Sequence, residues 1–273
     1  MRHTSFRTPD GVEIAAQEAG NPAGPEIVLI HGFSQCHLSF SHQIASPLAE
    51  TCRLVSYDIR GHGGSGKPCD PAAYRDARLW ADELSGVFDA MGLRRPVIVA
   101  WSYGGRILID YLQAYGSARL AGINVVGSRT RSDPAFLGPE NIRHQSRMAS
   151  PDIAENVAGT IGFLRTCAVR WDQQEFERHL AFNMLVPHTV RGWLGGRDFD
   201  ADALYAALTI PVLFTHGTED RVIPFPASRA AHALTPNSRL SVYEGVGHAP
   251  FLESTDRFNA ELNDFVLRCN DTG

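Results

Sequence analysis

Ser102 stands where an apolar run at residues 97–101 gives way to a helical pattern. The stretch 100–105 reads AWSYGG, so the residues two before and two after the serine, Ala100 and Gly104, are both small. Small side chains are needed there when a strand turns sharply into a helix and holds a hydroxyl at the tip of the turn. The pattern predicts a serine nucleophile, which would attack the carbon of a carbonyl group.

A serine nucleophile needs a base and an acid that orients the base, and the sequence offers both further along the chain. His248 lies on a glycine-framed loop in the stretch 246–253 (VGHAPFLE), ahead of the last helical pattern. Two adjacent carboxylates, Glu219 and Asp220, follow a strand pattern, and only one of them is expected to face the histidine. The spacing from Gly217 favours Asp220, so Glu219 is expected in solvent. The order serine, acid, histidine is typical of a nucleophile at a strand-to-helix turn.

Two backbone N–H groups are candidates to stabilise the negative charge that develops on a carbonyl oxygen under attack. The N–H of Tyr103 lies at a helix N-terminus directly after the serine. The N–H of Phe33 follows the strand pattern 27–30, in the sequence IHGF. His31 in that sequence is expected to anchor loop backbone, and His216 is expected to be a packed residue at a strand end rather than the base.

Short apolar runs bounded by turn residues alternate with helical patterns along most of the chain. Such runs are typical of parallel strands buried on both faces, and the alternation predicts an α/β fold with a mostly parallel sheet flanked by helices. The segment 12–18 follows the turn 8–11 and indicates an antiparallel hairpin at one sheet edge. Parallel strands are expected at 27–30, 53–57, 97–101, 123–126, 212–215 and 240–243, and helices at 74–91, 103–115, 226–234 and 255–268.

The alternation fails in the middle of the chain, where aromatic and amphipathic stretches occur without a strand pattern. We interpret residues 129–207 as an inserted helical cap on a core made of residues 1–128 and 208–273. An insertion at this point would lie over the carboxyl edge of the sheet, where open α/β sheets bind ligands. Its mainly apolar character predicts a small, largely apolar substrate. Trp101 and Tyr103 flank the serine and are expected to contact that substrate, although Trp101 can instead pack beneath the turn.

The 273-residue chain has a formal net charge of −5 and no long run of lysine or arginine, so neither nucleic acid nor a membrane surface is an expected partner. Its five cysteines lack metal-ligand spacing and no metal is expected. No cofactor is expected either: residues 61–67 (GHGGSGK) are similar to a phosphate-binding loop, but Pro68 follows where a helix is required. Without an apolar signal core, the expected compartment is the cytoplasm.

Together these motifs resemble the α/β-hydrolase superfamily over nearly the whole chain outside the cap. Three of them resemble its cofactor-free haloperoxidase, esterase and lactonase branch: HGF at 31–33, YDIRGHGGSGKP at 57–68 and GVGHAPF at 245–251. The resemblance implies a serine hydrolase that cleaves a carboxylic ester or a lactone through an acyl-enzyme intermediate. Epoxide hydrolases and haloalkane dehalogenases of this fold have aspartate in the place of Ser102, which argues against both activities.

Other activities on the same fold stay open. The resemblance also covers hydrolases of carbon–carbon bonds and perhydrolases, which use the same three side chains. A small-ligand receptor without catalysis is a further alternative from another class, because a fold alone does not fix function. The presence of Ser102, Asp220 and His248 together argues against a receptor.

Overall fold

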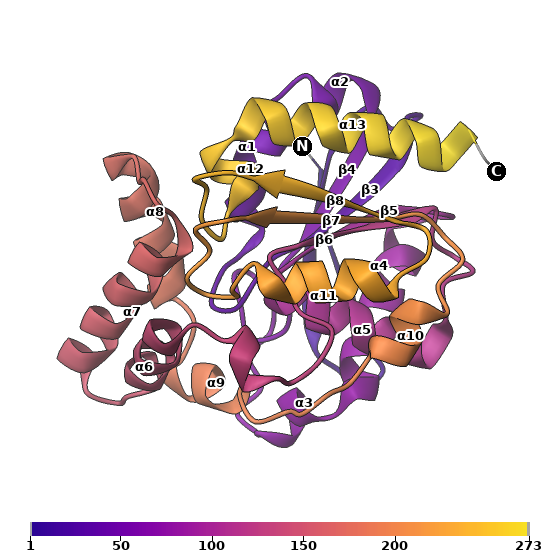
Figure 1. Ribbon diagram of the computed structural model, residues 1–273. Helices are drawn as coiled ribbons and strands as arrows, with labels where there is room; N and C mark the ends of the chain where they lie inside the picture. Colours follow the sequence, from indigo (N-terminus) through magenta and orange to yellow (C-terminus); the bar gives the residue numbers. More distant parts are fainter. Residues whose placement is uncertain (1, 272–273) are drawn as a thin grey trace.

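A computed structural model describes residues 2–271. Its described part contains one eight-stranded sheet in the order β1-β2-β4-β3-β5-β6-β7-β8 (Figure 1). The β1–β2 and β2–β4 pairs are antiparallel and the other neighbours are parallel, which confirms the predicted mostly parallel sheet with a hairpin at one edge. The strands are β1 (Arg2–Arg7), β2 (Glu13–Gly20), β3 (Glu26–Ile30), β4 (Arg53–Tyr57), β5 (Val97–Trp101), β6 (Gly122–Val126), β7 (Val212–Gly217) and β8 (Ser238–Tyr243).

The central strands are apolar because both faces of the sheet are covered. Every residue of β5 is buried, and its side chains alternate between two apolar layers. Ile98 belongs to the layer under helices α4 (Ala77–Met91) and α5 (Tyr103–Tyr115), whereas Val99 belongs to the layer under α13 (Thr255–Asp271). Figure 1 shows this sandwich, with α13 on one side of the sheet and α4, α5 and α11 (Pro226–Leu234) on the other.

The helices of the core largely match the predicted patterns. Helices α5 and α11 occupy the predicted ranges, and α13 runs three residues beyond its predicted end. The pattern at 74–91 forms two helices instead of one, because the Asp76 side chain accepts a hydrogen bond from the N–H of Arg78 and caps a new helix there. These helices are α1 (Ser41–Ile44), α2 (Leu48–Thr51), α3 (Ala72–Arg75), α4 (Ala77–Met91), α5 (Tyr103–Tyr115), α11 (Pro226–Leu234), α12 (Pro250–Glu253) and α13 (Thr255–Asp271).

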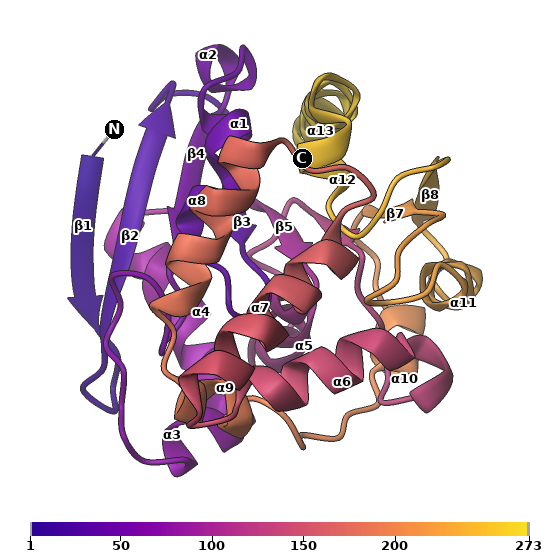
Figure 2. The ribbon, with the colours of Figure 1, turned by 90° about the vertical axis from the view of Figure 1, so that its left-hand side faces the viewer.

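The chain between β6 and β7 is helical and lies beyond the carboxyl ends of the strands (Figures 1 and 2). At its centre the buried guanidinium of Arg191 donates to Asn156 Oδ1 at 2.8 Å and Thr160 Oγ1 at 3.1 Å. An isolated bridge between Arg131 and Asp200 ties its two ends together. Its helices are α6 (Pro139–Met148), α7 (Ile153–Cys167), α8 (Gln173–Met184), α9 (His188–Trp193) and α10 (Asp202–Ala206).

The helices of this fold are all short or amphipathic. None of them, within residues 2–271, is long and apolar enough to cross a membrane.

Candidate active site

Ser102 occupies the sharp turn between β5 and α5 that its neighbours predict. Its φ of 56° and ψ of −113° lie outside the regions that side chains ordinarily favour. A Cβ on Gly104 would lie 2.6 Å from the Ile30 carbonyl oxygen, and one on Gly105 would lie 2.2 Å from Ser128 Oγ. The small residues after the serine are therefore required by close packing against two neighbouring strand ends, and the turn itself stores strain.

Asp220 and His248 meet at the carboxyl edge of the sheet. His248 Nδ1 donates to Asp220 Oδ2 at 2.7 Å, and both side chains are buried. The other carboxylate oxygen, Oδ1, accepts from the N–H groups of Val222 at 2.8 Å and Ile223 at 2.9 Å. Glu219, the other candidate acid, is exposed. Of the two adjacent carboxylates, the structure brings only Asp220 to the histidine.

The charge of Asp220 is held by its surroundings. Burial alone would raise the pKa of this carboxyl group, but attraction to His248 and hydrogen bonds from His216 and His248 outweigh burial and lower it below its ordinary range. A carboxylate that stays ionised keeps the proton of His248 on Nδ1 and leaves Nε2 as the basic nitrogen. This is the tautomer that a general base beside a serine requires.

The loop of His248 is tied to the strand that carries the serine. Trp101 Nε1 donates to the His248 carbonyl at 2.9 Å, and its ring packs at 4.8 Å between centroids on Phe251. Trp101 is 2% exposed and is not among the described residues that line the cavity over Ser102. The structure therefore places Trp101 beneath the turn and outside the cavity lining, and its contact with substrate stays a prediction. Tyr103, by contrast, lines the cavity.

The two predicted oxyanion donors are both free to act on a ligand. Neither the N–H of Phe33 nor that of Tyr103 has a hydrogen-bond acceptor within residues 2–271. A Cβ on Gly32 would lie 3.1 Å from Ser102 Cβ, so the Phe33 loop runs directly past the serine. The Tyr103 N–H also lies at the start of a 13-residue helix, which is the positive end of the helix dipole.

His31 and His62 hold the loops around the site rather than reacting. His31 Nε2 accepts from the N–H of Ile59 at 3.1 Å, and His62 Nε2 accepts from the N–H of Ser34 at 3.1 Å. Burial lowers the pKa of His31 to about 4 and that of His62 to about 3, so both rings are neutral near pH 7. This agrees with a structural role for His31.

Gly127 is a site residue that the sequence motifs did not single out. It follows β6 with a φ of +51°, and a Cβ there would lie 3.0 Å from His248 Nδ1 and 3.2 Å from Asp220 Oδ2. The hydrogen bond between the acid and the histidine thus passes directly over a glycine. Its position at the carboxyl end of a predicted central strand was the available signal.

A cavity of about 500 Å³ opens above Ser102, between the core and the helical segment. Phe33 and Tyr103 line it from the core, and Leu137 and Ile142 line it from the side of α6. Its size is that of a pocket for a small organic molecule. The strained serine therefore faces a space that a small organic molecule would fill.

Within residues 2–271, one group of side chains lies close enough to share a metal ion, namely Cys36, His37 and Asp58. Asp58 Oδ1 already accepts from the backbone N–H of His37 at 2.7 Å. Burial raises the pKa of the Cys36 thiol to about 12, so it is a poor source of the thiolate that metals bind. Asp58 also accepts from the N–H of Gly64 at 2.8 Å. Gly64 belongs to the segment 61–67 that is similar to a phosphate-binding loop, so this backbone N–H binds a carboxylate of the protein instead.

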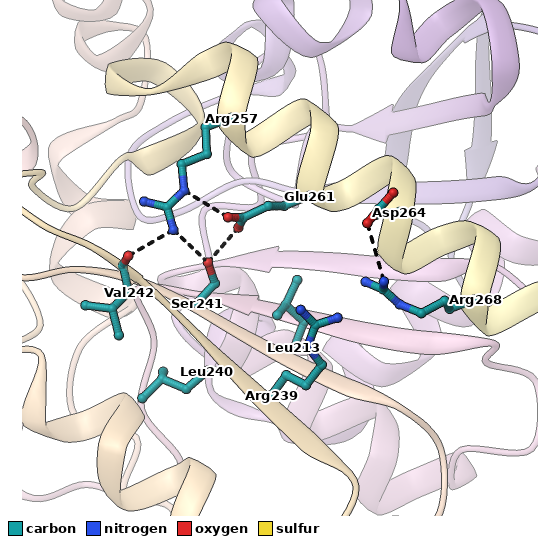
Figure 3. A pocket seen from close by; sticks show the side chains of 9 residues that line it. All are labelled: Leu213, Arg239, Leu240, Ser241, Val242, Arg257, Glu261, Asp264 and Arg268. Atoms are coloured by element: carbon teal, nitrogen blue, oxygen red, sulfur yellow. Dashed lines mark hydrogen bonds and ion pairs between the residues drawn. The ribbon is translucent and has the colours of Figure 1, made fainter.

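A smaller hollow of about 200 Å³ lies between β8 and α13 (Figure 3). Its polar groups bond to one another: Arg257 Nε donates to Glu261 Oε1 at 2.8 Å, and Ser241 Oγ donates to Glu261 Oε2 at 2.6 Å. Neither Ser102 nor any other predicted site residue lines it. These contacts fasten α13 to the edge of the sheet.

Comparison with known proteins identifies the class of this fold and site. The profile of the alpha/beta hydrolase family matches residues 27–261, and the chain belongs to that family. This confirms both the predicted fold and the predicted resemblance.

Two esterase structures are similar over almost the whole chain. A Burkholderia cenocepacia protein provisionally designated an aryl esterase is 35% identical, with a TM-score of 0.94 over 99% of this chain and 100% of its own. Esterase RhEst1 from Rhodococcus sp. ECU1013 is 30% identical, with a TM-score of 0.92 over 97% and 98% of the two chains. The chain is therefore similar to esterases in its whole architecture, including the helical segment.

One curated relative has another activity. Epoxide hydrolase A of Mycobacterium tuberculosis is 28% identical over 94% of this chain and 95% of its own length. Membership of the family establishes a hydrolase fold, and the bond that is cleaved depends on the site.

Proposed function

We propose that the protein is a serine esterase that hydrolyses carboxylic esters or lactones of small molecules through an acyl-enzyme intermediate. One pair of observations carries the proposal: the buried 2.7 Å hydrogen bond from His248 Nδ1 to Asp220 Oδ2, and a strained serine that lines the cavity. A nucleophile, a base with a fixed tautomer and two unpaired N–H donors are the components of acyl transfer. The two esterases that share the architecture support the same chemistry.

In this mechanism Ser102 Oγ attacks the ester carbonyl carbon while His248 Nε2 takes the hydroxyl proton. The N–H groups of Phe33 and Tyr103 stabilise the oxyanion of the tetrahedral intermediate, and each is worth about a hundredfold to a thousandfold in rate. His248 then returns the proton to the departing alkoxide, which leaves the acyl group on Ser102. Water, deprotonated by His248, attacks the acyl-enzyme, and the acid is released with the serine restored.

The serine separates this proposal from epoxide hydrolysis. The family resemblance implies that epoxide hydrolases of this fold use an aspartate nucleophile in the place of Ser102. A serine hydroxyl does not take over the role of that carboxylate. Perhydrolysis and cleavage of carbon–carbon bonds use the same three side chains and stay as alternatives to be measured.

The test is a panel of substrates given to the parent protein and to Ser102→Ala. p-Nitrophenyl acetate and butyrate report ester hydrolysis, γ-butyrolactone reports lactone opening, and acetate with hydrogen peroxide reports perhydrolysis. The proposal expects ester turnover by the parent and a loss of at least about a thousandfold in Ser102→Ala. Equal rates in the two proteins would show that the serine is not the nucleophile, and ligand binding without turnover would support a receptor.

A further inference from the structure

The cavity over Ser102 has a strongly one-sided charge. Four arginines line it, namely Arg106, Arg129, Arg191 and Arg197, and no aspartate or glutamate is among its described lining residues. The whole chain has a formal net charge of −5, so this concentration of positive charge opposes the overall balance. A concave site with charge of one sign concentrates ligands of the opposite sign.

Two of these arginines share one buried carboxylate. Arg197 Nη2 lies 2.6 Å from Asp110 Oδ2, and Arg106 Nε lies 3.5 Å from Asp110 Oδ1. Because Asp110 supplies one negative charge to two guanidinium groups, a positive charge is left over at this wall. Burial, together with repulsion from Arg197 and Arg129, lowers the pKa of Arg106 to about 10 although Asp110 opposes the shift.

Arg129 forms no direct ion pair: it is half-buried, and among residues 2–271 no carboxylate oxygen lies within 4.0 Å of its guanidinium. Asp133 and Asp198 attract it only from a greater distance, and burial outweighs them and lowers the pKa of Arg129. Its Nη1 donates to the backbone carbonyl of Asp133 at 3.3 Å. Its guanidinium also packs on the ring of Phe199 at 5.3 Å, and Arg106 packs on the same ring at 4.0 Å.

The position of Arg129 ties this charge to the reacting group. The residue before it, Ser128, donates from Oγ to the Ser102 carbonyl at 2.9 Å. Arg106 lies four residues after Ser102 along α5, a rise of about 6 Å along the helix axis. Ser102 and the four arginines line the same cavity, so an acyl group on Ser102 would share that space with the positive wall.

We infer that the cavity takes esters that carry a carboxylate a few bonds from the scissile carbonyl, as a half-ester of a short dicarboxylic acid does, and that Arg129 binds this carboxylate. The inference rests on the proposed esterase function and names its substrate class. Apolar groups of Leu137, Val222 and Ile223 line the same cavity and would hold the hydrocarbon between the two ends. The expectation of a largely apolar substrate is thereby refined to an apolar chain with an anionic end.

The test compares two esters of the same shape. Monoethyl glutarate carries a carboxylate where ethyl 5-methylhexanoate carries an isopropyl group, and kcat/KM is measured for both. The parent should prefer the half-ester. In Arg129→Leu the ratio of the two kcat/KM values should fall about tenfold to a hundredfold, and Arg129→Lys should keep part of the preference because it keeps the charge.

Arg143→Leu is the matched control, because Arg143 is an exposed residue of α6 that does not line the cavity. It removes the same formal charge and should leave the ratio unchanged. Equal kcat/KM for both esters in the parent, or a fall in Arg143→Leu as large as that in Arg129→Leu, would overturn the inference.

A binding measurement separates this inference from the esterase proposal. Calorimetric titration of monoethyl glutarate into Ser102→Ala measures binding without turnover. In the double variant Ser102→Ala with Arg129→Leu, the heat of binding should disappear. Inorganic phosphate at the same concentration is the control. If the half-ester binds but the parent does not turn it over, the esterase proposal fails and the carboxylate site stands. If the parent hydrolyses neutral esters but does not bind the half-ester, or binds phosphate equally well, the carboxylate site fails and the esterase proposal stands.

Discussion

His216 Nε2 lies 3.1 Å from Asp220 Oδ2, the same oxygen that accepts the hydrogen bond of His248. The ring is fully buried, with Nδ1 at 2.6 Å from Ser228 Oγ and Nε2 at 2.8 Å from the Ile223 carbonyl. Because the carbonyl can only accept, Nε2 carries the proton and Nδ1 accepts from the serine hydroxyl. His216 thus holds the same carboxylate oxygen that accepts the hydrogen bond of His248.

Replacing His216 should weaken the orientation of the acid without touching substrate. We expect His216→Asn to lower kcat about tenfold with KM unchanged, because a misdirected Asp220 holds His248 less well. Ser228→Ala removes only the outer hydrogen bond of His216 and should have a smaller effect in the same direction. Steady-state kinetics of both folded variants checks this, and a parental kcat in His216→Asn would show that the ring only packs.

The choice between the two adjacent carboxylates can be measured directly. Asp220→Asn should lower kcat by about a thousandfold to ten-thousandfold, because an amide in the place of the carboxylate disfavours the required tautomer of His248. Glu219→Gln removes the same charge one residue earlier, at an exposed position, and should change kcat less than twofold. A loss of activity in Glu219→Gln, with Asp220→Asn active, would reverse the assignment.

The close approach at Gly127 predicts a steric effect on catalysis. Gly127→Ala introduces a Cβ about 3 Å from the atoms of the hydrogen bond between His248 and Asp220, and should lower kcat about tenfold to a hundredfold by displacing them. Gly92→Ala is the control, because Gly92 has a φ of +62° but no atom within 4 Å of a Cβ there. If kcat falls equally in both variants, backbone strain rather than contact with the two side chains explains the fall.

Buried neutral histidines predict a loss of stability in acid. The pKa of His62 is about 3 in the folded protein and about 6.5 when unfolded, so the unfolded state binds one more proton between these values. Its contribution to stability is present above about pH 6.5 and is lost as the pH falls, at up to about 1.4 kcal/mol per pH unit. Urea unfolding of His62→Gln between pH 8 and 4.5 should show a slope smaller by this amount, and an unchanged slope would exclude His62 as a source of acid instability.

Much of the fold follows from local pattern. The ranges of α5 and α11 follow directly from apolar spacing and turn residues, because each helix packs one face on the sheet. The break at Asp76 depends on a single side-chain cap inside a continuous apolar pattern, so spacing alone does not reveal it. Division of the chain into a core and a cap at residue 129 stays a prediction.

The missed parts of the site come from contacts between distant segments. Gly127 ends a predicted strand, but that position alone does not reveal that a Cβ there would lie 3.0 Å from His248 Nδ1 and 3.2 Å from Asp220 Oδ2. Likewise the guanidinium groups of Arg106, on α5, and Arg129, just after β6, both pack on the ring of Phe199, which lies in the helical segment. Sequence spacing predicts which residues react, whereas the packing of loops over the sheet decides what surrounds them.

The central claim is that Ser102 is an activated nucleophile. The most direct measurement is mass spectrometry after treatment with a fluorophosphonate, which phosphonylates only activated serines. The parent should gain one adduct, located on the peptide that contains Ser102, and Ser102→Ala should gain none. An unmodified parent, or an adduct on another residue that persists in Ser102→Ala, would contradict the assignment.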